Sequence, residues 1–168
     1  RQRQMCIRDR LLTPKETKFI GEKVCLEEVK DGEERMILGH KVTFFDILST
    51  KAKQFGFCME YADGKKLTCC GDEPYNECEH KYAVNSTLLL HEAFCLFSQA
   101  DKFKPYEKHH STVKDACQLA QDLNVDNLIL YHTEDKNISR RKELYTEEGR
   151  QYYKGNLLIP DDLETFEL

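Results

Sequence analysis

Residues 86–92 read STLLLHE, a short apolar run that ends in a histidine and a glutamate. A run of this length without polar interruption is typical of a strand buried in a sheet. Residues 127–132, NLILYH, repeat the pattern and again end in a histidine. Between the two runs, residues 112–123 carry small or apolar side chains at positions 113, 116, 117 and 120, one face of an amphipathic helix. Residues 86–90 and 127–131 are thus predicted strands and residues 112–123 a predicted helix, which together form a strand–helix–strand unit.

The other segments extend this unit in both directions. Upstream, apolar runs and the Asp63-Gly64 turn signal predict an antiparallel meander of about four strands. Downstream, the pattern predicts a charged surface helix that stops near Gly155, then a closing strand and a tail. Strands first and alternating elements later indicate a mixed α+β and α/β fold with helices outside the sheet. The predicted strands are 22–29, 41–48, 54–61, 66–70 and 157–160, the predicted helices are 76–84 and 140–152, and the tail is 163–168.

The composition is that of one acidic domain. The 168 residues include 25 Lys and Arg and 30 Asp and Glu, which gives a net charge of −5. A chain of this length is most simply a single domain. No apolar run approaches the ~20 residues that a membrane helix needs. Because no basic tail is present, binding to nucleic acid would require a local basic groove or metal ions.

The eight cysteines indicate a reducing compartment. None forms a Cys-x-x-Cys pair, and the first residues lack the charged, apolar and small pattern of a signal peptide. We therefore expect free thiols that fill the core, in a cytoplasmic protein. The glycosylation sequons at Asn85 and Asn137 would then carry no glycan.

Residues 1–10, RQRQMCIRDR, have neither an apolar period nor turn residues. The stretch QMCIRDR resembles translated sequencing-adaptor read-through, so we expect residues 1–10 to be a non-native leader. On this interpretation the natural polypeptide begins near Leu11, and its gene extends further upstream.

Four polar clusters follow a predicted strand or open a predicted helix: Asp72, His91-Glu92, His109-His110 and His132. The carboxyl ends of strands in α/β sheets are where ligands usually gather. Carboxylates and imidazoles are ligands for zinc, and also for manganese or iron. Taken singly, each cluster has a structural interpretation as a turn aspartate, a hydrogen-bonded histidine, an ion pair or a helix cap. All four clusters in this order favour a metal site.

The motifs GDEP (71–74), HEAF (91–94) and HHST (109–112), followed by a buried strand ending in His132, resemble the later motifs of metallo-β-lactamase-fold hydrolases. The most similar subgroup is ribonuclease Z-like, whose motifs read G-D-x-x-P, H-E-A-T, H-S-T and T-H. The resemblance covers nearly all of the chain after its first twenty residues.

The resemblance implies a fold and a domain organisation. Residues 11–168 would form the C-terminal half of an αβ/βα four-layer sandwich, part of a single metallo-β-lactamase-like domain whose N-terminal half is missing. Half of such a sandwich would leave one apolar face of the sheet uncovered. We therefore expect low solubility or self-association, for example as a homodimer.

The resemblance also implies roles for particular residues. Asp72 matches the carboxylate that bridges two metal ions, and His132 matches the last histidine ligand of one metal. Glu92 and His110 match a pair that assists proton transfer around the bridging water and the leaving group, so they are the catalytic candidates. His91 would be structural. The implied cofactor is a pair of divalent ions, zinc first, with manganese or iron as alternatives, which would lower the pKa of a shared water.

Two departures from the family pattern concern the metal and the substrate. The family's main metal motif, H-x-H-x-D-H, has no match, since the six histidines include no His-x-His pair. His40 precedes a predicted strand and would not replace that motif. After His132 the chain reads TEDK instead of Phe-Ser, and no Gly/Pro-rich insertion could form a tRNA-gripping arm. We therefore expect a metal-dependent hydrolase that acts on phosphoesters, either small molecules or nucleic acid.

Other interpretations stay open. A structural zinc module would use Cys69, Cys70, Cys78 and His80, although their spacing does not match the usual zinc knuckles. A non-catalytic binding domain could keep the fold without the chemistry, and the chain could also be an inactive fragment. A serine or cysteine hydrolase is a further alternative, although the sequence lacks a G-x-S-x-G motif and its cysteines stand in strand-like or apolar contexts.

Overall fold

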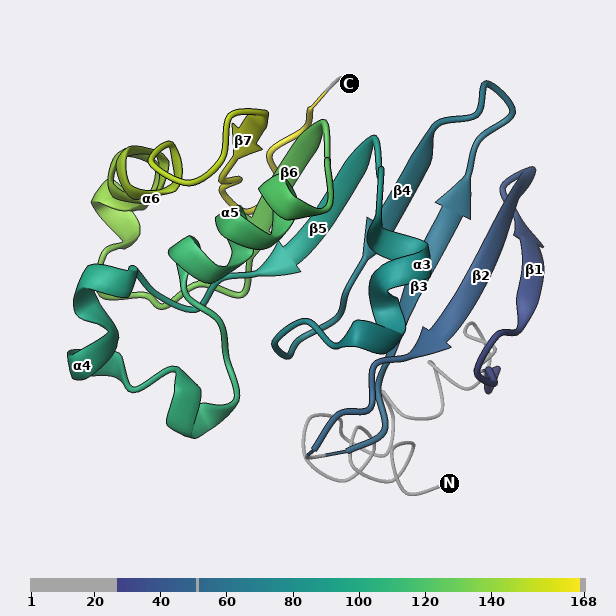
Figure 1. The fold of residues 1–168 in the computed structure, drawn as a ribbon, viewed down its shortest axis with the longest axis horizontal. Coiled ribbons are helices and arrows are strands. Elements are labelled where there is room, and N and C mark those ends of the chain that lie inside the picture. Colours follow the sequence, from purple (N-terminus) through teal and green to yellow (C-terminus); the bar gives the residue numbers. More distant parts are fainter. Residues whose placement is uncertain (1–26, 51, 167–168) are drawn as a thin grey trace, which may run out of the picture.

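The computed structural model describes residues 27–50 and 52–166, which form a seven-stranded mixed sheet with helices packed against it (Figure 1). The predicted leader, residues 1–10, lies outside the described residues. The order of the strands in the sheet follows the order of the chain. The strands are β1 (Glu34–Ile37), β2 (His40–Asp46), β3 (Phe55–Glu60), β4 (Lys66–Cys69), β5 (Leu88–Glu92), β6 (Asn127–Tyr131) and β7 (Asn156–Leu158). Strands β1 to β4 pair antiparallel, and β4 to β7 pair parallel.

The antiparallel half confirms three of its four predicted strands, because β2, β3 and β4 lie on the predicted runs. The prediction of a strand over 22–29 is wrong for residues 27–29, which have no regular structure, and residues 22–26 lie outside the described part. The edge strand is β1 instead. Leu38 and Gly39 both have positive φ and form a tight turn between β1 and β2, with Ile37 paired to His40.

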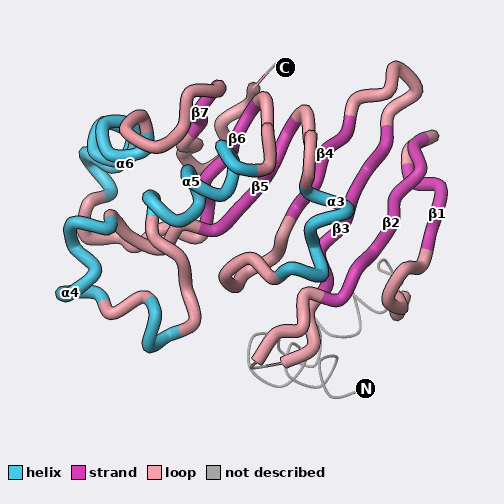
Figure 2. The backbone as a smooth tube through the Cα atoms, viewed as in Figure 1, coloured by secondary structure: helices cyan, strands magenta, loops and turns pink. Residues whose placement is uncertain are grey.

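The parallel half alternates strands and helices, as predicted. Helix α5 (Val113–Asp122) buries the predicted face, and its N-cap Thr112 exchanges hydrogen bonds with Asp115 in a capping box. The connection between β5 and α5 contains short helical turns that the sequence pattern did not predict (Figure 2). The helices are α3 (His80–Ala83), α4 (Ala100–Phe103), α5 (Val113–Asp122) and α6 (Arg141–Gly149), and the 3-10 turns are η1 (Glu77–Glu79), η2 (Phe97–Gln99), η3 (Tyr106–Lys108) and η4 (Ile138–Arg140). Within the described ranges, none of the helices is both long and apolar enough to cross a bilayer.

Two in-register rows of side chains define the two faces of the sheet. One row is buried beneath α3, α5 and α6 and consists of Cys58, Thr68, Leu89, Leu128 and Leu157. The other row lies on the opposite face and is only half-buried, and it consists of Phe44, Phe57, Cys69, Leu90, Ile129 and Leu158. That this face lacks a second layer of a sandwich stays a prediction. Self-association of the chain stays a prediction.

Candidate metal centre

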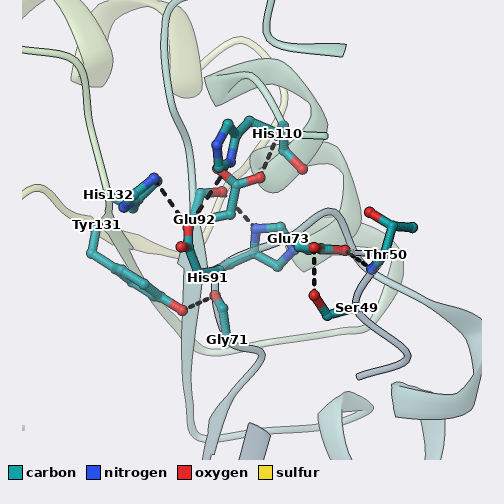
Figure 3. A network of polar contacts seen from close by, with 11 residues as sticks. Ser49, Thr50, Gly71, Glu73, His91, Glu92, His110, Tyr131 and His132 are labelled. Carbon is teal, nitrogen blue, oxygen red and sulfur yellow. Dashed lines mark hydrogen bonds and ion pairs between the residues drawn. The ribbon is translucent and has the colours of Figure 1, made fainter. Parts of the chain in front are cut away.

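The loops that follow the carboxyl ends of β4, β5 and β6 lie close together at one end of these parallel strands (Figure 3). Asp72 follows β4, Glu92 is the last residue of β5, and His132 directly follows β6. Parallel pairing aligns these strand ends, with Cys69 opposite Leu90 and Glu92 opposite Tyr131. Residues that are far apart in sequence therefore reach one location, as expected for the edge where α/β proteins bind ligands.

The corner that carries Asp72 is held from two sides. Gly71 has φ +80, a conformation that glycine adopts without steric cost. On the other side, the buried Glu73 carboxylate accepts hydrogen bonds from the Ser49 hydroxyl at 2.6 Å and from the Thr50 backbone N–H at 3.1 Å. These contacts fix the direction in which the chain leaves β4, so the position of Asp72 is determined by its neighbours.

Asp72, His110 and His132 each bring one donor atom to a common point, with all three atoms within 4.8 Å of one another. Asp72 Oδ1 lies 3.1 Å from His132 Nε2 and 3.9 Å from His110 Nδ1. Donors arranged tetrahedrally at ~2.0–2.1 Å from one zinc ion lie about 3.3 Å apart. The separation of Asp72 and His132 is close to this value, and that of Asp72 and His110 is wider. The side chains of Asp72 and His132 are 44% and 41% exposed, while the Asp72 Oδ1 and His110 Nδ1 atoms that face the point are buried. The three residues therefore fit a divalent cation.

Glu92 and His110 form a buried pair beside this point. The Glu92 side chain is fully buried, and its Oε2 faces His110 Nδ1 at 3.5 Å. Its other oxygen accepts a hydrogen bond from the Ser111 backbone N–H. Burial raises the pKa of Glu92 to about 7, because desolvation disfavours the charged carboxylate. A carboxyl group that titrates near neutral pH is suited to exchange a proton through a neighbouring imidazole.

Phe94 forms an apolar wall against both imidazoles. Its ring centroid lies 5.2 Å from that of His110, with the planes 22° apart, and 6.3 Å from that of His132. The Phe94 carbonyl accepts hydrogen bonds from the Tyr145 hydroxyl at 3.1 Å and from the Glu134 backbone N–H at 2.8 Å. The segment after β5 therefore contacts the loop after β6, and the wall is fixed to both.

His91 does not join the cluster. Its Nδ1 lies 2.7 Å from the Glu92 carbonyl, which can only accept, so Nδ1 carries a proton. The ring is almost completely buried, and burial lowers the pKa of His91, which favours the neutral form. A neutral, buried ring agrees with the structural role that the motif resemblance implies.

The structure brings together the four residues predicted for the site: Asp72, Glu92, His110 and His132. His110 Nδ1 faces both Glu92 and Asp72, so the geometry is compatible with a proton carrier or with a third metal ligand. Sequence reasoning missed Phe94, which stands where the subgroup motif has threonine. It also missed Tyr131, whose hydroxyl donates a hydrogen bond to the Gly71 carbonyl (Figure 3). The substitution in the HEAF motif could have pointed to Phe94, whereas no local pattern indicates a contact as distant as that of Tyr131.

The alternative of a structural zinc module has no support in the described part of the chain. There, Asp72, His110 and His132 are the one group of three or more metal-ligand side chains whose donor atoms converge. Cys70 is buried and Cys78 is exposed, so the cysteines of the proposed module face different environments.

Curated proteins match part of the sequence, although no family model matches the chain. Ribonuclease Z of Bacillus thuringiensis (strain Al Hakam) is 31% identical over 103 residues, which are 61% of this chain and 33% of that protein. Ribonuclease Z of Bacillus anthracis (strain A0248) matches to the same extent. The aligned part of the chain therefore spans about a third of the length of these relatives.

Solved structures match the fold at lower identity. The metallo-β-lactamase fold protein YhfI from Bacillus subtilis has a TM-score of 0.64 at 14% identity, over 79% of this chain and 51% of that chain. Human tRNase Z, short form, has a TM-score of 0.56 at 22% identity, over 74% of this chain and 42% of that chain. A diphosphatase of the PhnP family has a TM-score of 0.58 at 13% identity, over 88% and 53%. The chain is therefore a metallo-β-lactamase-fold protein, and the part of its sequence that matches curated proteins resembles ribonuclease Z.

Proposed function

We propose that this chain supplies part of the active site of a metal-dependent phosphoester hydrolase, in which two divalent cations, zinc first, activate water. The supporting observation is the convergence of the Asp72, His110 and His132 donor atoms within 4.8 Å, beside the buried Glu92. The names of the similar proteins, Ribonuclease Z and tRNase Z, support an RNA phosphoester as the substrate class. Bound cations would lower the pKa of a water and polarise the phosphoryl oxygens.

The partly exposed residues of the site and its buried residues have different proposed roles. Asp72 and His132, whose side chains are partly exposed, would hold the cation between two strand ends. Glu92 is buried and orients His110 through the 3.5 Å contact between Oε2 and Nδ1. His110 delivers a proton to the departing oxygen and recovers one through Glu92. Phe94 keeps water from the far side of both imidazoles.

The chain corresponds, on this proposal, to the C-terminal part of one metallo-β-lactamase-like domain, because its motifs resemble the later motifs of the subgroup. Asp72 and His132 would supply two donors to one cation, and His110 would add a third only if it were a ligand instead of a proton carrier. A second cation requires donors from outside the described residues. We also propose a cytoplasmic location, since Cys58, Cys69, Cys70, Cys78, Cys95 and Cys117 are all free thiols.

The proposal is tested by zinc calorimetry on the chain, together with hydrolysis of bis(p-nitrophenyl) phosphate. Asp72→Asn keeps the size of the side chain and removes its charge, so it should weaken zinc binding at least about tenfold, since metal ligands must be deprotonated. Asp63→Asn is the matched control, because Asp63 is an exposed turn aspartate that pairs only with Lys65. Wild-type zinc affinity in Asp72→Asn, or no zinc binding by the wild-type chain, contradicts the proposal. Zinc binding without hydrolysis would favour a non-catalytic binding domain.

A further inference from the structure

The hydroxyl of Tyr131 connects two strands that are not neighbours. Tyr131 is the last residue of β6, and its hydroxyl donates a hydrogen bond to the carbonyl of Gly71, which follows β4 (Figure 3). Strand β5 lies between β4 and β6 in the sheet. The tyrosine therefore reaches past the end of β5, on the face of the sheet that also carries Cys69, whose Sγ lies 3.8 Å from the same hydroxyl.

Both ends of this hydrogen bond adjoin a candidate metal ligand. Tyr131 precedes His132, and Gly71 precedes Asp72. The two candidate ligands themselves meet at 3.1 Å, between Asp72 Oδ1 and His132 Nε2. The loop after β4 and the loop after β6 are thus joined by two contacts. One is the hydrogen bond from the Tyr131 hydroxyl to the Gly71 carbonyl, and the other is the side-chain contact between Asp72 and His132. A shift of either loop would have to change both contacts.

The loop after β6 also has a backbone conformation that needs support. His132 has φ +53, in the left-handed region, which costs a residue with a Cβ about 1–2 kcal/mol. A strained backbone persists only where the surrounding structure holds it in place. The hydrogen bond from Tyr131 to Gly71 is one contact that can hold the loop after β6.

We propose that Tyr131 is a positioning residue, whose hydroxyl sets the separation of Asp72 and His132 before a cation binds. The inference rests on the proposed function, because it assigns a cation to that pair. Tyr131 itself does not contact the cation or the substrate. Its effect is to reduce the number of arrangements of the two ligands, and so to raise the affinity of the site.

Tyr131→Phe removes the hydroxyl and keeps the ring, and Tyr153→Phe is a matched control. Tyr153 is buried, and its hydroxyl also donates to a backbone carbonyl, that of Val125, at 2.8 Å, but it touches neither ligand loop. Both variants should lose a similar, small part of their thermal stability. Tyr131→Phe should weaken zinc binding about tenfold or more, as is typical when a supporting hydrogen bond near a ligand is lost. Tyr153→Phe should bind zinc like the wild type.

Equal zinc affinity in the two variants, with equal losses of stability, would overturn the inference while leaving the proposed function intact. A cobalt(II) titration adds a spectroscopic readout, since the visible absorption of bound cobalt reports the ligand geometry. The absorption should change in Tyr131→Phe and stay unchanged in Tyr153→Phe. An unchanged spectrum in Tyr131→Phe would count against a positioning role.

A metal-free measurement separates this inference from the proposed function. The backbone N–H groups of Cys70 and Glu134 flank the two loops and donate to the carbonyls of Leu90 and Phe94. Both should exchange with solvent faster in Tyr131→Phe than in Tyr153→Phe. If the wild-type chain binds no zinc but this difference appears, the proposed function fails and the structural tie stands. If the two variants exchange alike, the tie does not hold the loops.

Discussion

Asp72 Oδ1 and His132 Nε2 lie 3.1 Å apart, although sixty positions separate the two residues in sequence. The contact follows from the parallel register of β4, β5 and β6, which places the loops after β4 and β6 on either side of the end of β5. His110 completes the group from the segment that enters α5. The fold thus brings an acid and two imidazoles from separate loops to one point.

His110→Ala separates the two roles that the geometry allows for His110. As a proton carrier, its loss should slow phosphodiester hydrolysis by ~10²–10⁴-fold and leave zinc affinity within about threefold, since Asp72 and His132 remain. Calorimetry and steady-state kinetics measure the two effects. His109→Asn is the control, because His109 is exposed with φ +55, a conformation that asparagine tolerates. A parallel loss of zinc and of turnover would make His110 a ligand instead.

Gly71→Ala tests the corner that carries Asp72. The added Cβ meets Ile47 Cδ1 at 2.8 Å, in addition to the strain of a left-handed backbone. Gly64→Ala has the same kind of strain, with φ +84, but its Cβ meets nothing within 4 Å. Gly71→Ala should therefore lower the free energy of unfolding by more than the ~1–2 kcal/mol of backbone strain expected for Gly64→Ala.

Ile47→Val in the Gly71→Ala background removes the Cδ1 atom that the new Cβ would meet. This second change should recover part of the lost stability, although Ile→Val alone costs ~0.5–1.5 kcal/mol in a core. Denaturant unfolding of both single variants and the double variant gives the coupling. Additive losses would show that the corner tolerates the Cβ by moving.

Thr112→Ala tests how the start of α5 supports the proton-transfer pair. Thr112 caps α5 through its hydrogen bonds with Asp115, and the preceding N–H, that of Ser111, binds Glu92. Loss of the cap should cost about 1 kcal/mol of stability and should lower turnover more than zinc affinity. Asn76→Ala removes the equivalent capping box of η1 and is the control for stability alone. Equal turnover in Thr112→Ala and Asn76→Ala would show that the N-cap of α5 does not support the proton-transfer pair.

Local sequence patterns were sufficient to predict the strands and the helix that position the site. They were insufficient to predict contacts between segments that are distant in sequence. The apolar runs of β5 and β6 and the helical period of α5 are short-range signals, and each predicted element forms. The hairpin turn at Leu38 was missed because a leucine with positive φ has no sequence signature. The bond from Tyr131 to Gly71 depends on the order of three strands, which periodicity does not report.

In the site, too, residues in local motifs were predicted, whereas contacts between distant segments were not. Asp72, Glu92, His110 and His132 were predicted from motifs that end strands or open a helix. The structure places the four side chains together, and their roles stay predictions. The wall formed by Phe94 was not found, since its value depends on the imidazoles that it contacts from other segments. Residues that support a site through packing carry little signal of their own.

The dependence of stability on pH gives a test of buried acids away from the cluster. Glu79 in η1 is almost completely buried, and burial raises its pKa from 4.5 to about 7. A carboxyl group whose pKa is higher in the folded state stabilises the fold fully below about pH 4.5. That contribution is lost as the pH rises through the interval up to about 7 and stays lost above it. The size of the change is about 3 kcal/mol, at ~1.4 kcal/mol per tenfold change in proton affinity.

Glu79→Gln should flatten this dependence, because the amide is uncharged at every pH and its oxygen can still accept from the Asn76 backbone N–H, as Glu79 does at 3.0 Å. Denaturant unfolding at pH 5 and pH 8 measures the difference for the wild type and the variant. Glu77→Gln, at an exposed glutamate of the same turn, should leave the wild-type slope unchanged. Glu92 also has a raised pKa, so some pH dependence should persist in Glu79→Gln. If Glu79→Gln and Glu77→Gln have the same slope, Glu79 is charged in the folded protein, and the polar surroundings of η1 compensate for its burial.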